Sequence, residues 1–120
     1  MFWINSFNLK SGKRSAYQQW LLSPEARSLN ADVEQELGIK YQGTYWTVNG
    51  FGDFDCEEWW EIPDWATVDK ARESKANEKR DDRIWEQGFI DDTRAAGRPR
   101  ILRTTEDIKT WSLPEKSEPQ

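Results

Sequence analysis

The strongest constraint in this sequence is a strand pattern that carries apolar side chains on both of its faces. Successive side chains of a strand point to opposite sides of the sheet, so residues two apart share a face. Residues 2–9 place Trp3, Asn5, Phe7 and Leu9 on one side and Phe2, Ile4, Ser6 and Asn8 on the other. Residues 54–62 likewise put Trp59 and Trp60 on opposite sides. A sheet built from these strands needs a cover on each face.

The helical part of the first half is expected to break in the middle. Residues 14–37 have apolar side chains at helical spacing, but along two different stripes. Ser23 is a favourable N-cap and Pro24 suits the first position of a new helix. Gly38 then follows the last apolar residue, as is common where helices stop. We therefore predict two helices that meet at Ser23-Pro24.

The order strand, helix, strand, strand, helix, strand is that of the ferredoxin-like, or split βαβ, fold. The later strands are expected at residues 39–48, 54–62 and 100–104, with a hairpin turn at 49–53 and a helical segment from Asp64 that breaks within 77–82. The pattern predicts an α+β domain over residues 1–105 with an antiparallel sheet, followed by a tail at 106–120. Helices cover one face of such a sheet, so a second copy of the sheet is the simplest cover for the other. We expect a homodimer.

Composition excludes several classes of site and partner. The chain has no His, which removes a Ser-His-Asp triad, an imidazole base and His metal ligands, and its single Cys rules out an internal disulfide. The 17 basic residues against 22 acidic ones argue against a nucleic-acid surface. In residues 75–83 acids and bases alternate, which indicates a solvated helix face. With no long apolar run and no signal peptide, we expect a cytoplasmic protein without membrane contact, metal or cofactor.

Glu58 is the candidate for moving a proton. The strand alternation places it on a face whose other members are Phe54, Cys56, Trp60 and Ile62. A carboxylate among apolar groups binds its proton more tightly and can act as an acid or base near neutral pH. The alternative is a Glu at the sheet margin that pairs with an arginine such as Arg100 or Arg103.

Aromatic residues of the same strands are candidates for a ligand site. Trp60, Trp46 and Tyr45 could wall a flat aromatic molecule by stacking, or could serve as core and dimer contact. Asn5 could bind a ligand carbonyl through its amide, or bond to neighbouring backbone. Cys56, alone and without a His to activate it, is more typical of a small hydrophobe than of a nucleophile.

The element order, the stretch NSFNLKSGK before the first helix and the stretch FDCEEWWEIPDWATVDKA resemble the dimeric α/β-barrel superfamily. That superfamily contains antibiotic-biosynthesis monooxygenases, haem-degrading monooxygenases and NIPSNAP-like proteins, and the resemblance covers residues 2–104. It implies two sheets that pack as a barrel and a pocket between sheet and helices. Asn5 and Trp60 match the family's pocket residues, and Cys56 and Glu58 stand where relatives carry a further polar group. The haem-degrading branch uses a His to hold iron, which this chain lacks.

Two functions remain open on these grounds. The first is a homodimeric domain that binds an apolar aromatic small molecule and carries out cofactor-independent oxygenation or isomerisation. In that case Asn5 would orient the substrate oxygen, Trp60 would pack its ring and Glu58 would move a proton. The second is a non-catalytic dimerisation module in which the aromatic residues serve the core and the dimer contact.

Overall fold

Four strands form one sheet in the order β2-β3-β1-β4. The computed structural model of the chain describes residues 1–46, 54–91 and 100–105. The strands are β1 (Phe2–Phe7), β2 (Lys40–Trp46), β3 (Cys56–Glu61) and β4 (Arg100–Thr105). Each neighbouring pair runs antiparallel.

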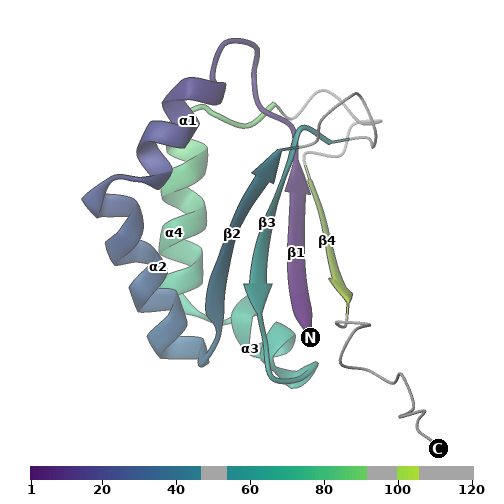
Figure 1. Cartoon of the computed structure of the whole chain (residues 1–120). Coiled ribbons are helices and arrows are strands. Elements are labelled where there is room, and N and C mark those ends of the chain that lie inside the picture. The colour runs from purple at the N-terminus through teal and green to yellow at the C-terminus, as the bar shows by residue number, and fades with distance from the viewer. Residues whose placement is uncertain (47–53, 92–99, 106–120) are drawn as a thin grey trace, which may run out of the picture.

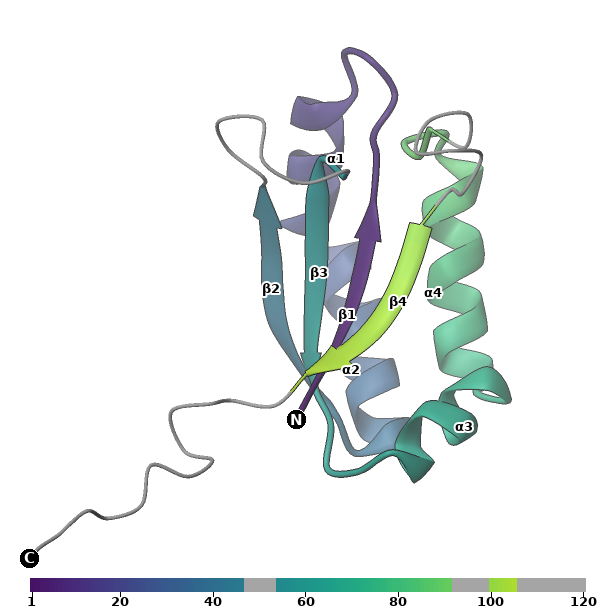
Figure 2. The same ribbon diagram turned by 90° about the vertical axis from the view of Figure 1, so that its right-hand side faces the viewer.

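The helices gather on one side of this sheet. They are α1 (Arg14–Leu21), α2 (Pro24–Leu37), α3 (Ala66–Arg72) and α4 (Lys75–Glu86). Figure 1 shows α1, α2 and α4 beside one face of the sheet. In the view of Figure 2 the strands lie in front of α1 and α2, and α4 stands to the right of β4. No described helix lies over the opposite face, which we call the open face. The predicted α+β class, antiparallel sheet and element order are confirmed.

The predicted break in the first helical segment is also confirmed. The Ser23 hydroxyl accepts a hydrogen bond from the Ala26 N–H at 3.2 Å, and Pro24 opens α2. At the far end, Gly38 has φ of 68°, a left-handed conformation that a residue without a Cβ adopts without strain. These local signals let α1 and α2 each turn its own apolar stripe toward the core.

The break in the second helical segment comes earlier than predicted. It lies at Glu73-Ser74, not within 77–82, and the Ser74 hydroxyl accepts the N–H of Asn77 at 3.0 Å. The break was predicted there because residues 72–83 contain almost no apolar side chains. Helix α4 runs through that stretch because a buried arginine, Arg80, occupies its inward face.

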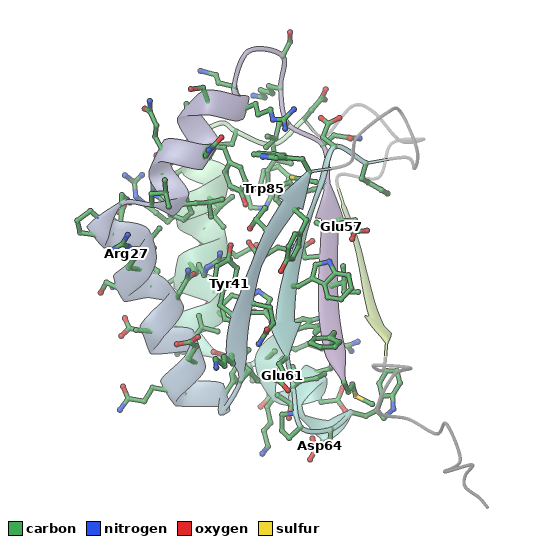
Figure 3. The ribbon with its side chains drawn as sticks, in the orientation of Figure 1. Arg27, Tyr41, Glu57, Glu61, Asp64 and Trp85 are labelled. Carbon is green, nitrogen blue, oxygen red and sulfur yellow. The ribbon has the colours of Figure 1, made fainter. Side chains whose placement is uncertain are left out.

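Strand pairing decides which side chains share the helix-covered face. Trp3 lies opposite Trp60, Asn5 opposite Glu58, and Phe7 opposite Cys56, so these pairs alternate along one face. Strand β2 adds Tyr41, Thr44 and Trp46 to this face, after a bulge between Tyr41 and Gly43 that shifts the register. Figure 3 shows Tyr41 on the helix side of the sheet and Glu57 on the other side.

The core consists of two apolar clusters. The first includes Phe7, Tyr17, Trp20, Leu29, Cys56, Ile84 and Phe89, and the second includes Val33, Leu37, Ile39, Trp60, Ile62 and Ala71. Polar residues separate the clusters on three elements. Asn30 lies between Leu29 and Val33 on α2, Glu58 between Cys56 and Trp60 on β3, and Arg80 stands four residues before Ile84 on α4. We call Asn30, Glu58 and Arg80 the polar layer.

Two sequence expectations lie outside the described residues, namely the hairpin turn at 49–53 and the tail at 106–120. Within the parts that the structure describes, no helix combines the length and the apolar character needed to cross a membrane.

Candidate functional site

The polar layer is organised around a buried ion pair. Arg80 donates to both carboxylate oxygens of Glu58, at 3.0 and 2.9 Å, and its Nε donates to the Asn30 amide oxygen at 2.5 Å. The side chains of Arg80 and Glu58 are 5% and 3% exposed. Among the described residues, the arginine that pairs with Glu58 is Arg80 of α4. The side chains of Arg100 and Arg103, the partners considered from the sequence, lie outside the described residues.

The charges of this pair support each other. Burial opposes the charge of Arg80, but the charge and hydrogen bonds of Glu58 outweigh it, so the pKa of the guanidinium lies above its ordinary value. The two-pronged contact in turn favours the ionised carboxylate. Glu58 also accepts the indole N–H of Trp60 at 3.0 Å. As an acceptor that already serves Arg80 and Trp60, Glu58 fixes the positions of both side chains.

Aromatic rings enclose the Arg80 guanidinium. Its central carbon lies 5.2 Å from the ring centroid of Trp60 and 5.9 Å from that of Tyr41. These distances are within the range of cation–π attraction. The Tyr41 hydroxyl also shares a hydrogen bond with Thr44, the residue opposite Glu58 on β2. The layer is thus held rigidly from four elements, β2, β3, α2 and α4.

Beside the ion pair lies a pocket of about 50 Å³ between the sheet and α4. We call it the Asn5 pocket; its lining residues are Trp3, Asn5, Glu58, Trp60, Asn77, Arg80 and Asp81. Among the described residues, none donates a hydrogen bond to the buried amide oxygen of Asn5. A buried acceptor without a donor costs free energy, so a group that enters the pocket and donates to Asn5 removes that cost.

Three of the residues selected from the sequence therefore meet at one place. Asn5, Glu58 and Trp60 all line the Asn5 pocket, because β1 and β3 pair in a register that brings Asn5 opposite Glu58. The sequence of neither strand alone predicts that β1 pairs with β3. This pairing brings the three candidate residues together in one pocket.

Cys56 and Trp46 lie elsewhere on the same face. Cys56 is fully buried in the first apolar cluster, and the half-buried Trp46 packs against that cluster with the Arg14 guanidinium 4.3 Å from its ring centroid. Burial, followed by the charge of Glu58, raises the pKa of the Cys56 thiol. A protonated buried thiol is a poor nucleophile, so Cys56 serves as packing. Neither residue lines the Asn5 pocket.

Tyr45 lies on the open face, away from Trp46 and Trp60. Its ring is 6.0 Å from that of Trp59, which in turn is 5.4 Å from Phe2, and Tyr45 is 52% exposed. Neighbouring residues of a strand face opposite sides, so Tyr45 and Trp46 cannot wall the same ligand. We call Phe2, Tyr45 and Trp59 the open-face aromatic cluster.

Sequence reasoning missed Arg80 and Asn30. Residues 75–83 were interpreted as a solvated helix face, which is wrong at Arg80 because this side chain is almost fully buried. Counting back in steps of four from Ile84 gives Arg80 and then Ala76, so helical spacing could have placed Arg80 inward. A second group that was missed is the hydroxyl of Tyr17, which is buried and finds no hydrogen-bond partner among the described residues.

No family model matches the chain, and no curated protein or solved structure matches it either. Within the described ranges, no group of three or more His, Cys, Asp or Glu side chains is placed to hold a metal ion.

Proposed function

We propose that the protein is a homodimeric, ferredoxin-like domain that binds a small molecule in the Asn5 pocket. The observation that carries the proposal is the buried Asn5 amide oxygen, which has no donor among the described residues. The other polar groups around it are held in place, since Glu58 and Arg80 bond to each other and Trp60 bonds to Glu58. Such a pre-ordered site needs little rearrangement when a ligand enters.

The size of the pocket restricts what enters it. A single water needs roughly 10–15 Å³ of such space, and a drug-sized ligand occupies about 300–1,000 Å³. About 50 Å³ therefore suits a small polar group and not an entire aromatic ring. The apolar remainder of a larger ligand would lie against Trp3 at the lining of the pocket.

Chemistry at this site is the second part of the proposal. In a cofactor-independent oxygenase or isomerase acting on an apolar aromatic compound, Asn5 would orient the polar group of the substrate and Glu58 would move a proton. The ion pair with Arg80 stabilises the ionised carboxylate of Glu58, so it opposes transfer of a proton to Glu58. The geometry thus supports binding more strongly than proton transfer.

The open-face aromatic cluster supports the homodimer. Phe2, Tyr45 and Trp59 form a run of ring contacts on a sheet face that no described helix covers. Aromatic side chains are enriched in the buried centres of protein interfaces. A second copy that lays its own sheet on this face would give the two-sheet barrel of the superfamily that the sequence resembles.

The same cluster favours a second candidate function, a non-catalytic dimerisation module. In that case the contact between two copies would be the whole function, and the Asn5 pocket would hold only water. The two candidates differ in what the pocket binds and agree on the dimer.

A titration of the Asn5→Ala variant tests the first candidate. The indole N–H signal of Trp60, assigned by its loss in Trp60→Phe, reports on the pocket in ¹⁵N-resolved spectra. A panel of small polar molecules should include one that shifts this signal saturably in the parent protein. Asn5→Ala should weaken the binding of that molecule roughly three- to tenfold, the effect of one lost hydrogen bond. Tyr45→Phe, on the open face, is the matched control and should bind as the parent does.

A further inference from the structure

We infer that the exposed side of α4 is a second contact surface, which binds the same side of α4 in another copy of the chain with the two helices antiparallel. This contact lies on the helix layer, apart from the open face and from the Asn5 pocket. It adds a salt-sensitive association to the proposed function and does not depend on it.

Four charged residues form one line along the exposed side of α4. Lys75, Lys79, Asp82 and Glu86 are spaced i, i+4, i+7 and i+11, which keeps them on one face of a helix. All four residues are exposed. We call them the charge stripe. Its first two members are basic and its last two are acidic.

The charge stripe borders a groove of about 360 Å³ between α2 and α4. The described lining of this groove comes from these two helices and includes all four members of the stripe. Arg83, also in the lining, donates to Glu25 of α2 at 2.7 Å and lies 3.8 Å from Glu86. The groove is therefore a recess in the helix layer, bordered by charged side chains, that can receive the side chains of a second helix.

The order of charges in the stripe is unfavourable within a single copy. Residues four apart on a helix are neighbours, so Lys75 is placed beside Lys79 and Asp82 beside Glu86, and like charges at this spacing destabilise a helix. Bases in the first half of a helix and acids in the second half also oppose the helix dipole. Within the stripe, the step from Lys79 to Asp82 is the one that brings opposite charges together.

A second copy turns the same order into an attraction. The midpoint between Lys79 and Asp82 is also the midpoint between Lys75 and Glu86. When two α4 helices lie antiparallel about a twofold axis at this point, Lys75 faces Glu86 of the second copy and Lys79 faces its Asp82. The twofold axis repeats both ion pairs, and the antiparallel dipoles attract as well. The stripe thus complements itself, which identifies the partner as another copy of the chain.

Sedimentation velocity of the full chain at low and at high salt tests the contact. Salt screens exposed ion pairs, so the protein should form a larger assembly at about 20 mM salt than at about 500 mM. Lys75→Glu combined with Lys79→Glu makes the stripe wholly acidic and should weaken this association roughly tenfold or more. The new acids suit the start of a helix, so the helical circular dichroism signal should persist. Lys70→Glu combined with Arg72→Glu, at exposed positions of α3, changes the net charge equally and is the matched control.

A charge swap makes the test specific to the stripe. Asp82→Lys combined with Glu86→Lys makes the stripe wholly basic and should likewise abolish self-association. An equimolar mixture of the acidic and the basic variant should associate at low salt. All four substitutions in one chain invert the stripe and should restore self-association.

The contact does not form if the assembly is no larger at low salt, if the acidic variant associates as the parent does, or if the α3 control loses association equally. Failure of the mixture to associate would also overturn it. In each of these cases the stripe is a solvated helix face. The open-face dimer is judged separately, because apolar contact should hold it together at high salt in every stripe variant.

Discussion

Replacing Arg80 with Met should destabilise the protein far more than its place in a highly charged helix suggests. The substitution removes two hydrogen bonds to Glu58 and one to Asn30, and it takes the charge of Arg80 away from a carboxylate that is 3% exposed. Breaking a buried ion pair in this way costs about 3–5 kcal/mol of unfolding free energy. This is a large share of the 5–15 kcal/mol that typically stabilises a domain.

Arg83→Met is the matched control on the same helix. Arg83 also pairs with a glutamate, Glu25, at 2.7 Å, but the two side chains are 41% and 44% exposed. Solvent screens such a pair, so its loss should lower the unfolding free energy far less than the loss of Arg80 does. The difference between the stability losses of Arg80→Met and Arg83→Met reports the effect of burial, because both variants make the same substitution on the same helix.

The assay is urea unfolding followed by far-ultraviolet circular dichroism at one fixed protein concentration, since the stability of the proposed dimer would depend on concentration. Combining Arg80→Met with Glu58→Met should restore part of the stability lost in Arg80→Met alone, because no buried charge remains. Equal costs for Arg80→Met and Arg83→Met, or strict additivity in the double variant, would refute the account of the polar layer.

Three further predictions follow from local features. Ser23→Ala removes the side-chain acceptor at the start of α2 and should lower the unfolding free energy by about 1 kcal/mol in the same urea assay. Cys56 should resist alkylation by iodoacetamide at neutral pH until urea unfolds the protein, because burial raises its pKa and keeps the thiol protonated; fast labelling of the folded protein would contradict its burial. Glu36 accepts the Ala76 N–H at 2.9 Å, which lowers the pKa of its carboxyl group, so its stabilising effect should be present above its unfolded pKa and fade as pH falls through the folded value. The stability difference between the parent and Glu36→Gln should accordingly shrink in acid, and a difference that grows would refute this.

The parts of the fold that sequence predicts are those governed by local chemistry. The Ser23-Pro24 boundary and the stop at Gly38 were predictable because capping depends on neighbouring residues only. The alternation that puts Glu58 and Trp60 on one face follows from strand geometry alone. The same rule places Tyr45 and Trp46 on opposite faces, so the expectation that both wall one ligand is wrong.

The candidate site depends on contacts between distant parts of the chain. Asn5 and Glu58 come together through the pairing of β1 with β3, and Arg80 reaches Glu58 from α4. A charged residue on a helix is usually exposed to solvent, so the burial of Arg80 is unusual for an arginine. Only the position of Glu58 across the core explains why this arginine faces inward.

Native mass spectrometry of the protein purified without denaturation from its own host tests whether the Asn5 pocket holds a ligand. We expect a dimer that carries a small additional mass, and we expect Asn5→Ala, produced and purified in the same way, to form the same dimer without that mass. A parent dimer with no added mass, or an added mass that Asn5→Ala retains in full, would contradict binding in the Asn5 pocket.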